Sequence, residues 1–365
     1  FCPLLLMGSL PSECRGPPPP INDFELYFEK ISPAEEGRVR AEIREMVLGN
    51  QRHKKDFPGP LPATLGRSSL PLLKQELFYV TEKSDGERHM LLLTDCGTFL
   101  VNRKFELRRV KCKTYSDVFH DQLPILLDGE MMRPEGEQAT FLAYDCMNTR
   151  GCNISRNRFV DRLRAVTAIS DKFVEVLPIS DIPADFPFRI TVKLFVPQKE
   201  INRILSKISL YKGSYMYVDS NRRRCNRNDG LIFVADKDSY RPERPVSLLK
   251  WKWPSKNSVD LLIMSPFVNN NGEIELFCGG LHNNTIPIRK IQADQKTQDL
   301  VKQWGMDRSD LIVECVYDRN IGFWRICNPR HDKIRPNFIT TVIQTMETQI
   351  DNIEKSDLRL ACGVR

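Results

Sequence analysis

The sequence has 365 residues, of which 41% are hydrophobic, and it carries a formal net charge of +7 at neutral pH. This length accommodates two domains with hydrophobic cores of their own, and the modest positive charge suits a partner that bears phosphates. The 11 cysteines are an odd number without the spacing of a zinc site, which favours free thiols in a reducing compartment.

The first 20 residues differ in composition from the rest of the chain. Phe1–Leu6 is apolar but too short to span a bilayer, and the run Pro17–Pro20 favours an extended lead-in. We therefore expect a flexible N-terminal extension at residues 1–20. No other long apolar run occurs in the sequence, so we expect no membrane partner. The first predicted helix begins after Ser32 and ends at Gly49.

The segment Lys83-Ser84-Asp85-Gly86-Glu87-Arg88 separates two apolar runs that we predict to be strands. It places one lysine at a bend between strands, beside a glycine that lets a ligand approach the backbone. Taken alone, the segment is better explained as a polar hairpin turn.

Three later predicted strands carry polar residues of possible function, and a fourth begins with one. The first of them runs into Asp128-Gly129-Glu130, which is either a carboxylate site or a simple turn. The next holds Tyr144, either a base-stacking or a core aromatic. Lys193 lies in the middle of the third, and Asp229-Gly230 opens the fourth.

Two basic segments follow in the second half of the chain. Leu248–Trp253 is a predicted strand on which Lys250 and Lys252 share a face, and Arg330-His331-Asp332-Lys333 comes much later. A nucleophilic lysine must lose its proton, and burial and neighbouring cations lower its pKa from about 10.4. The same cations hold phosphate, so the set suggests a lysine that attacks a nucleotide. Taken alone, Lys250 and Lys252 are typical of a solvated strand face, and Arg330–Lys333 is typical of a surface ion-pair cluster.

The run Pro254–Asn257 interrupts the strand pattern and predicts a domain boundary. Beyond it, three predicted strands and a helix at residues 294–304 fit a small barrel. A further helix is expected after Pro336, packing back on the first domain, and the last dozen residues are expected to fray. Within the first domain, apolar spacing predicts helices near residues 155–173 and 198–210.

In this order, the segments resemble the six motifs of the covalent nucleotidyltransferase superfamily of mRNA capping enzymes and polynucleotide ligases. Within it, the chain resembles the GTP:RNA guanylyltransferases of eukaryotic mRNA capping. Pro336-Asn337 follows the Arg330–Lys333 motif, and aspartate rather than glutamate precedes Gly230. The resemblance implies an α+β fold, with a nucleotidyltransferase domain of antiparallel sheets and helices, an OB-fold domain and a C-terminal helix, at residues 21–253, 254–336 and 337–365.

The resemblance also implies a mechanism. Lys83 attacks the α-phosphorus of GTP, releases pyrophosphate and becomes a lysyl–GMP phosphoramidate, from which GMP passes to a 5′-diphosphate RNA end as the GpppN cap. Asp229 and Glu130 are the implied ligands of Mg²⁺ or Mn²⁺. The implied GTP-binding residues are Ser84, Arg88, Arg103, Glu130, Tyr144, Lys193, Asp229, Lys250, Lys252, Arg330, Asp332 and Lys333.

On the nucleoside side, the family pattern puts Arg88, Arg103 and Glu130 by the ribose. Tyr144 stacks on guanine, and Lys193 offers its ammonium group to guanine O6, which adenine lacks.

On the phosphate side, Lys250 and Lys252 hold the α-phosphate. Arg330 and Lys333 reach over from the second domain and orient the β- and γ-phosphates, which requires domain closure.

The implied partners are GTP, RNA, a separate RNA 5′-triphosphatase, a separate cap methyltransferase and the phosphorylated tail of RNA polymerase II, which implies a nuclear protein. The C-x₅-R spacing of Cys152–Arg158 lacks the histidine and glycines of a cysteine phosphatase, so we interpret it as chance. The alternatives are an ATP-dependent polynucleotide ligase with a lysyl–AMP intermediate and a non-catalytic scaffold. The intact lysines of the motifs argue against the scaffold.

Overall fold

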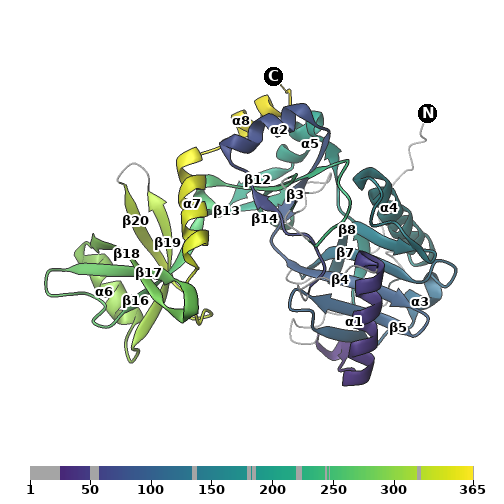
Figure 1. Ribbon diagram of the computed structural model, residues 1–365, viewed down its shortest axis with the longest axis horizontal. Helices are drawn as coiled ribbons and strands as arrows, with labels where there is room; N and C mark the ends of the chain where they lie inside the picture. Colours follow the sequence, from purple (N-terminus) through teal and green to yellow (C-terminus); the bar gives the residue numbers. More distant parts are fainter. Residues whose placement is uncertain are drawn as a thin grey trace, which may run out of the picture.

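The computed structural model describes residues 25–49, 57–133, 138–178, 182, 186–218, 224–242, 245, 247–318 and 322–364. These residues form three sheets with helices packed on them (Figure 1). Most strand pairs are antiparallel, which confirms the predicted α+β class. The predicted extension at residues 1–20 lies outside the described residues.

The first sheet has the strand order β1-β6-β5-β4-β7-β8-β10, with β9 beside β8. The segment Met90–Leu93 in β4 is buried on both faces, because alternate side chains enter two separate cores. In chain order, the strands are β1 (Phe28–Glu29), β4 (Glu87–Thr94), β5 (Gly97–Asn102), β6 (Leu107–Val110), β7 (Ile125–Met132), β8 (Thr140–Thr149), β9 (Cys152–Asn153) and β10 (Arg189–Val192).

Helices cover both faces of this sheet. The helix α1 (Pro33–Leu48) packs on one face through Val39, Ile43 and Val47, while α3 (Thr114–Val118) and α4 (Phe159–Val176) pack on the other. The predicted start of α1 is confirmed, because the side chain of Ser32 accepts a hydrogen bond from the amide of Glu35.

The second sheet has the order β11-β3-β14-β13-β12, and β15 joins β14 to the short β2. Strands β3 and β4 are consecutive in the chain but belong to different sheets, so the bend at Lys83–Gly86 connects the two sheets. The strands are β2 (Ala63–Thr64), β3 (Phe78–Ser84), β11 (Val196–Pro197), β12 (Ile208–Tyr211), β13 (Ser214–Val218), β14 (Arg224–Ala235) and β15 (Leu248–Lys252).

The helices at the second sheet correct two predictions. The helix predicted at 198–210 is only a 3₁₀ turn, η3 (Gln198–Glu200), and α5 (Ile201–Leu205), because Ile208 begins a hairpin strand. The C-terminal residues do not fray: α8 (Lys355–Ala361) packs near α2 (Leu70–Gln75), and Leu358, Ala361 and Cys362 enter the core. A further 3₁₀ turn, η2 (Arg67–Ser69), precedes α2.

The third sheet has the order β18-β17-β16-β19-β20, and α6 (Gln295–Trp304) lies between β18 and β19 in the chain. A three-strand meander, a helix and a hairpin in this order make an OB-fold, as predicted. Its strands are β16 (Ser258–Met264), β17 (Glu273–Gly279), β18 (Thr285–Gln292), β19 (Asp310–Asp318) and β20 (Phe323–Pro329), with 3₁₀ turns η4 (Pro254–Lys256) and η5 (Leu281–Asn283).

The helix α7 (Ile339–Asp351) lies between the OB-fold and the rest of the molecule (Figure 1). It packs on the third sheet through Val342. The segment predicted as one C-terminal helix at 337–365 therefore contains two helices with different packing partners. The domain division at residue 254 stays a prediction. Among the described residues, no helix is both long and apolar enough to cross a membrane.

Candidate active site

A cavity of about 1000 Å³ is lined by residues of the first and second sheets and by α7. The polar face of α7 contributes Thr340, Gln344 and Thr348 to its wall. Eight of the predicted GTP-binding and catalytic residues line this cavity: Lys83, Ser84, Arg88, Arg103, Glu130, Tyr144, Lys193 and Lys250. The space and its cations suit a nucleoside triphosphate.

Lys83 lies one residue before the end of β3, opposite a β-bulge in β14. The bulge adds Asp229 between the residues that pair with Lys83 and Ser84, so its carboxylate comes within 2.9 Å of the Lys83 Nζ. Gly230 has a φ of +143°, and a Cβ there would lie 2.0 Å from the carbonyl oxygen of Trp251. A side chain at this position would therefore separate β14 from β15.

The lysines of β15 lie on the same face of the second sheet as Lys83. Gly230 pairs with both Lys83 and Lys252, and Lys250 lies one side-chain repeat away from Lys252. Strands β3 and β15 are both neighbours of β14, so they run about 9–10 Å apart. Lys250 lines the cavity, whereas Lys252 lies beyond its margin on the same face.

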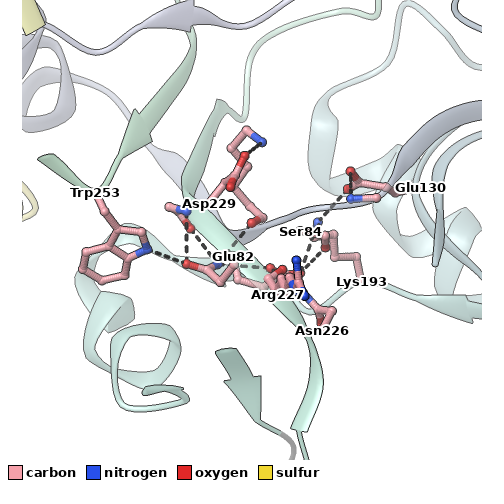
Figure 2. Close-up of polar contacts among 12 residues, drawn as sticks. Glu82, Ser84, Glu130, Lys193, Asn226, Arg227, Asp229 and Trp253 are labelled. Carbon is pink, nitrogen blue, oxygen red and sulfur yellow. Dashed lines mark hydrogen bonds and ion pairs between the residues drawn. The ribbon is translucent and has the colours of Figure 1, made fainter. Parts of the chain in front are cut away.

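Lys193 is buried and occupies the centre of a polar cluster (Figure 2). Its Nζ lies 2.7 Å from the Ser84 Oγ, 3.2 Å from a Glu82 carboxylate oxygen and 3.6 Å from a Glu130 carboxylate oxygen. The Ser84 and Glu82 oxygens lie within hydrogen-bond distance of the ammonium group, whereas Glu130 makes a longer ion-pair contact. The structure thus excludes a solvent-facing edge lysine, and Glu130 is its most weakly held partner.

Arg88 lies in a second polar cluster, around Asp128. The fully buried Asp128 accepts two hydrogen bonds from Arg88 and one each from the hydroxyls of Tyr144 and Tyr240, at 2.8 and 2.6 Å. Burial disfavours the charge of Arg88, but the Asp128 carboxylate outweighs it and raises the pKa of Arg88 well above its ordinary value. The ring of Tyr144 is therefore fixed at the cavity wall through its hydroxyl.

The two predicted metal ligands contact different cations. Asp229 contacts Lys83, while Glu130 accepts a hydrogen bond from the Gly86 amide and faces Lys193. Within the described ranges, no group of three or more histidine, cysteine, aspartate or glutamate side chains is placed to hold a metal ion. Mg²⁺ commonly uses one or two protein carboxylates together with substrate phosphates, so the partly exposed Asp229 fits this role. Glu130 fits it less well because both of its oxygens already have partners.

The predicted residues of the second domain do not line the cavity. Arg330 follows β20, and it binds Asp332 through two hydrogen bonds of 2.9 Å and Asp260 through one of 2.8 Å. The bonds from Arg330 lower the pKa of Asp332 to about 2. Lys333 is exposed in the same segment. In the described arrangement, the cations of the second domain therefore lie outside the cavity.

Sequence reasoning missed several residues that shape the site. Glu82, Asn228 and Trp253 are buried and hydrogen-bonded beneath the Lys83 bend, and Tyr240 binds Asp128. The first three adjoin recognised motifs, so their positions were a usable signal. Tyr240 lies in an irregular segment with no periodic pattern.

The arrangement defines a class of protein. Two sheets enclose a nucleotide-sized cavity with a lysine at its edge, and an OB-fold with further cations follows them. These features place the chain among the nucleotidyltransferases.

Comparison with known proteins identifies the family. The family model "mRNA capping enzyme, catalytic domain" matches residues 28–254, and "mRNA capping enzyme, C-terminal domain" matches residues 256–359. The chain therefore belongs to the mRNA capping enzyme family, and it is an mRNA guanylyltransferase, as predicted. This decides against the ATP-dependent ligase and the scaffold.

Individual relatives are distant. "mRNA-capping enzyme subunit alpha" of Schizosaccharomyces pombe is 26% identical over 90% of this chain and 85% of its own length. "mRNA-capping enzyme" of Danio rerio is 28% identical over 80% of this chain and 47% of its own length. A solved mycobacterial DNA ligase D with ATP is 15% identical and covers 75% of this chain and 94% of its own, with a TM-score of 0.41. Likeness of that degree says nothing about activity.

Proposed function

We propose that Lys83 is the nucleophile of the guanylyltransferase reaction. Its uncharged Nζ attacks the α-phosphorus of GTP, the bond to the β-phosphate oxygen breaks, and pyrophosphate leaves. A terminal oxygen of the 5′-diphosphate RNA then attacks the phosphoramidate, the P–N bond breaks, and the GpppN cap forms with Lys83 regenerated. The observation that supports this most is the position of Lys83 at the cavity edge, opposite the Asp229 bulge.

The cations around the cavity suit the negative charge of the substrate. We propose that Lys250 and Lys252 bind the α-phosphate, since they lie on the face that carries Lys83. Such preorganised charges stabilise the transition state of phosphoryl transfer most effectively where water is excluded. Arg103, exposed in the turn after β5, is proposed to bind the ribose or phosphates.

On the nucleoside side, Tyr144 has its hydroxyl held by Asp128, which leaves a ring of fixed orientation for stacking on guanine. We propose that Lys193 reads guanine O6. Because Ser84 and Glu82 hold it closely, this role requires Lys193 to exchange Glu130 for the base, and Glu130 would then turn to the ribose near Arg88.

Asp229 is the proposed protein ligand of Mg²⁺ or Mn²⁺, with Glu130 as the less suitable predicted ligand. A divalent ion there would balance triphosphate charge and polarise the phosphoryl oxygens. The carboxylate of Asp229 also keeps the Nζ of Lys83 at the cavity edge.

The charges of the OB-fold complete the proposed site by domain closure. Arg330, Asp332 and Lys333 would move toward the cavity with GTP bound, orient the leaving pyrophosphate and move away again to admit RNA. Arg330 is already held by Asp332 and Asp260, so the domain carries this charge in a fixed orientation.

The partners and the location are proposed from the relatives. Fungal relatives bear the name "mRNA-capping enzyme subunit alpha", which supports a separate subunit for the RNA 5′-triphosphatase. A separate cap methyltransferase, contact with the phosphorylated polymerase tail and a nuclear location remain proposals that follow from a role in mRNA processing.

The test uses radiolabelled GTP with a divalent metal, followed by denaturing gel electrophoresis. Lys83→Ala and Lys83→Arg should form no labelled adduct, since arginine stays protonated and cannot attack. Lys74→Ala, which changes an exposed lysine of α2 outside the cavity lining, is the matched control and should label like the wild type. Covalent GMP on either Lys83 variant would show that another residue is the nucleophile.

A further inference from the structure

The buried side chain of Asn228 organises the backbone on both sides of the Lys83–Asp229 pair. Its Oδ1 accepts hydrogen bonds from the Gly230 amide at 3.0 Å and from the Trp253 indole at 2.8 Å. Its Nδ2 lies 2.9 Å from the Gly230 carbonyl oxygen, 3.2 Å from that of Lys83 and 3.2 Å from a Glu82 carboxylate oxygen. One amide thus bridges the bulged strand β14, the strand β3 that carries Lys83, and Trp253, which directly follows β15.

These bonds act where the regular strand ladder fails. The register between β14 and β3 shifts between Asn228 and Gly230, so Asp229 has no partner residue opposite it. Asn228 binds the backbone on the far side of the bulge and the carbonyl oxygen of Lys83. Asn228 thus contacts the backbone on both sides of the Lys83–Asp229 pair without touching either charged group.

Trp253 connects this amide to the junction between the domains. Besides its hydrogen bond to Asn228, its ring stacks on Tyr215 with centroids 4.0 Å apart, and the Lys355 Nζ lies 4.8 Å from the ring centroid. Lys355 is the first residue of α8, and Pro254 follows Trp253 directly. Figure 2 shows the Trp253 indole pointing toward the polar cluster around Glu82.

The chain crosses between the OB-fold and the second sheet twice, and both crossings meet near Trp253. The outgoing crossing is η4, and the returning crossing follows α7. Gln349 of α7 donates hydrogen bonds to the carbonyl oxygens of Pro254 and Asn257, at 3.0 and 2.9 Å. Trp251, in edge contact with Trp253, donates one of 2.8 Å to the carbonyl oxygen of Ile353.

We propose that Asn228 and Trp253 are positioning residues of the guanylylation step, which hold Lys83 against Asp229 and connect this pair to the interdomain crossings. The inference rests on the proposed role of Lys83. It assigns no contact with GTP to either residue. It explains why the buried Trp253, which directly precedes the η4 crossing, donates its indole N–H to Asn228 at the bulge.

The test separates formation of the adduct from its use. Trp253→Phe keeps an aromatic ring between Tyr215 and Lys355 but removes the indole N–H. At saturating GTP, single-turnover adduct formation should slow about 10- to 100-fold, the range expected when a reacting group is displaced by about 1 Å. The GTP concentration for half-maximal rate should stay close to the wild-type value. Transfer from preformed lysyl–GMP to RNA should also stay close to wild type, because the covalent bond then fixes Lys83.

Trp251→Phe is the matched control, since it removes an indole N–H two residues earlier, at the end of β15, that bonds to the Ile353 carbonyl oxygen and not to Asn228. It should leave adduct formation per active site near the wild-type rate, with active sites counted from the labelled protein at completion. Asn228→Ala is the second variant, and it should slow adduct formation at least as much as Trp253→Phe.

Three outcomes would overturn the inference. They are equal rates for Trp253→Phe and Trp251→Phe, an equal loss in both half-reactions of Trp253→Phe, or an Asn228→Ala variant that forms adduct at the wild-type rate. A labelled Lys83→Ala variant would instead refute the proposed nucleophile. The failure of the inference and the failure of the proposed function are therefore distinguishable.

Discussion

Asp128→Asn is the most informative single substitution for the stability of the site. The aspartate is fully buried and accepts four hydrogen bonds, two from Arg88 and one each from Tyr144 and Tyr240. Asparagine has the same size, but it offers one acceptor oxygen and turns an amide group toward donors. The Arg88 side chain, which is only 14% exposed, would keep its charge without a carboxylate partner.

The expected loss can be estimated from that burial. Removing one partner of a buried ion pair costs about 3–5 kcal/mol, because the other charge stays desolvated. At about 2–4 °C per kcal/mol for a domain of this size, the melting temperature should fall by about 6–20 °C. Thermal unfolding followed by circular dichroism, without nucleotide, measures it.

Glu87→Gln is the matched control, because Glu87 pairs with Arg133 at 2.6 Å on the surface of the same sheet. An exposed pair contributes about 0–1 kcal/mol, so this variant should melt within a few degrees of the wild type. If Asp128→Asn melts no lower than Glu87→Gln, the Asp128 cluster does not stabilise the fold as argued.

Three further predictions concern charge at other positions. Arg330→Ala and Lys333→Ala should remove adduct formation from GTP but spare transfer from preformed adduct, where pyrophosphate is absent; equal losses in the two half-reactions would show that these residues are misplaced. Lys193→Met should narrow the preference for GTP over ATP, measured as the ratio of adducts on the folded fraction; an unchanged ratio would leave Lys193 a structural residue. Burial lowers the pKa of His89 in the folded state, so the unfolded chain binds the extra proton, and stability should fall as pH drops below about 6.5. His89→Gln should show a shallower fall in melting temperature between pH 7.5 and 5.5, and an unchanged slope would contradict this.

The sequence predicted the local elements of the site because their signals are local. Apolar runs marked the strands around Lys83 and Lys250, and Gly86 marked the bend after Lys83. Two predictions were wrong: Lys193 lies between β10 and β11 rather than in the middle of a strand, and Asp229-Gly230 lies at a bulge inside β14 rather than at its start. The helix cap at Ser32 depends on residues only three positions apart, so it was predictable as well. The partner that a strand residue faces across the cavity was not predictable, because it depends on the order of the strands in the sheets.

The errors arose where tertiary contacts override local pattern. The apolar spacing through Ile208 fits a helix, yet pairing with Tyr217 makes this residue part of a strand. The polar C-terminal residues were expected to fray, but Leu358, Ala361 and Cys362 are buried in the core of the second sheet. The paired state of Lys193 depends on carboxylates more than 60 positions away in sequence. No window of sequence reports such contacts.

The division of the C-terminal segment determines how the enzyme can close. Because α7 packs on the third sheet through Val342 and lines the cavity on its other side, it would move with the OB-fold in the proposed closure. Because α8 is buried on the second sheet, it would stay with Lys83, the proposed nucleophile. Between them, Asn352 has a left-handed backbone, and Asp351 accepts a hydrogen bond of 2.8 Å from the Arg67 amide. The proposed closure, which would bring Arg330 to the phosphates, would therefore bend the chain at this crossing and at η4, beside Trp253, which donates a hydrogen bond to Asn228.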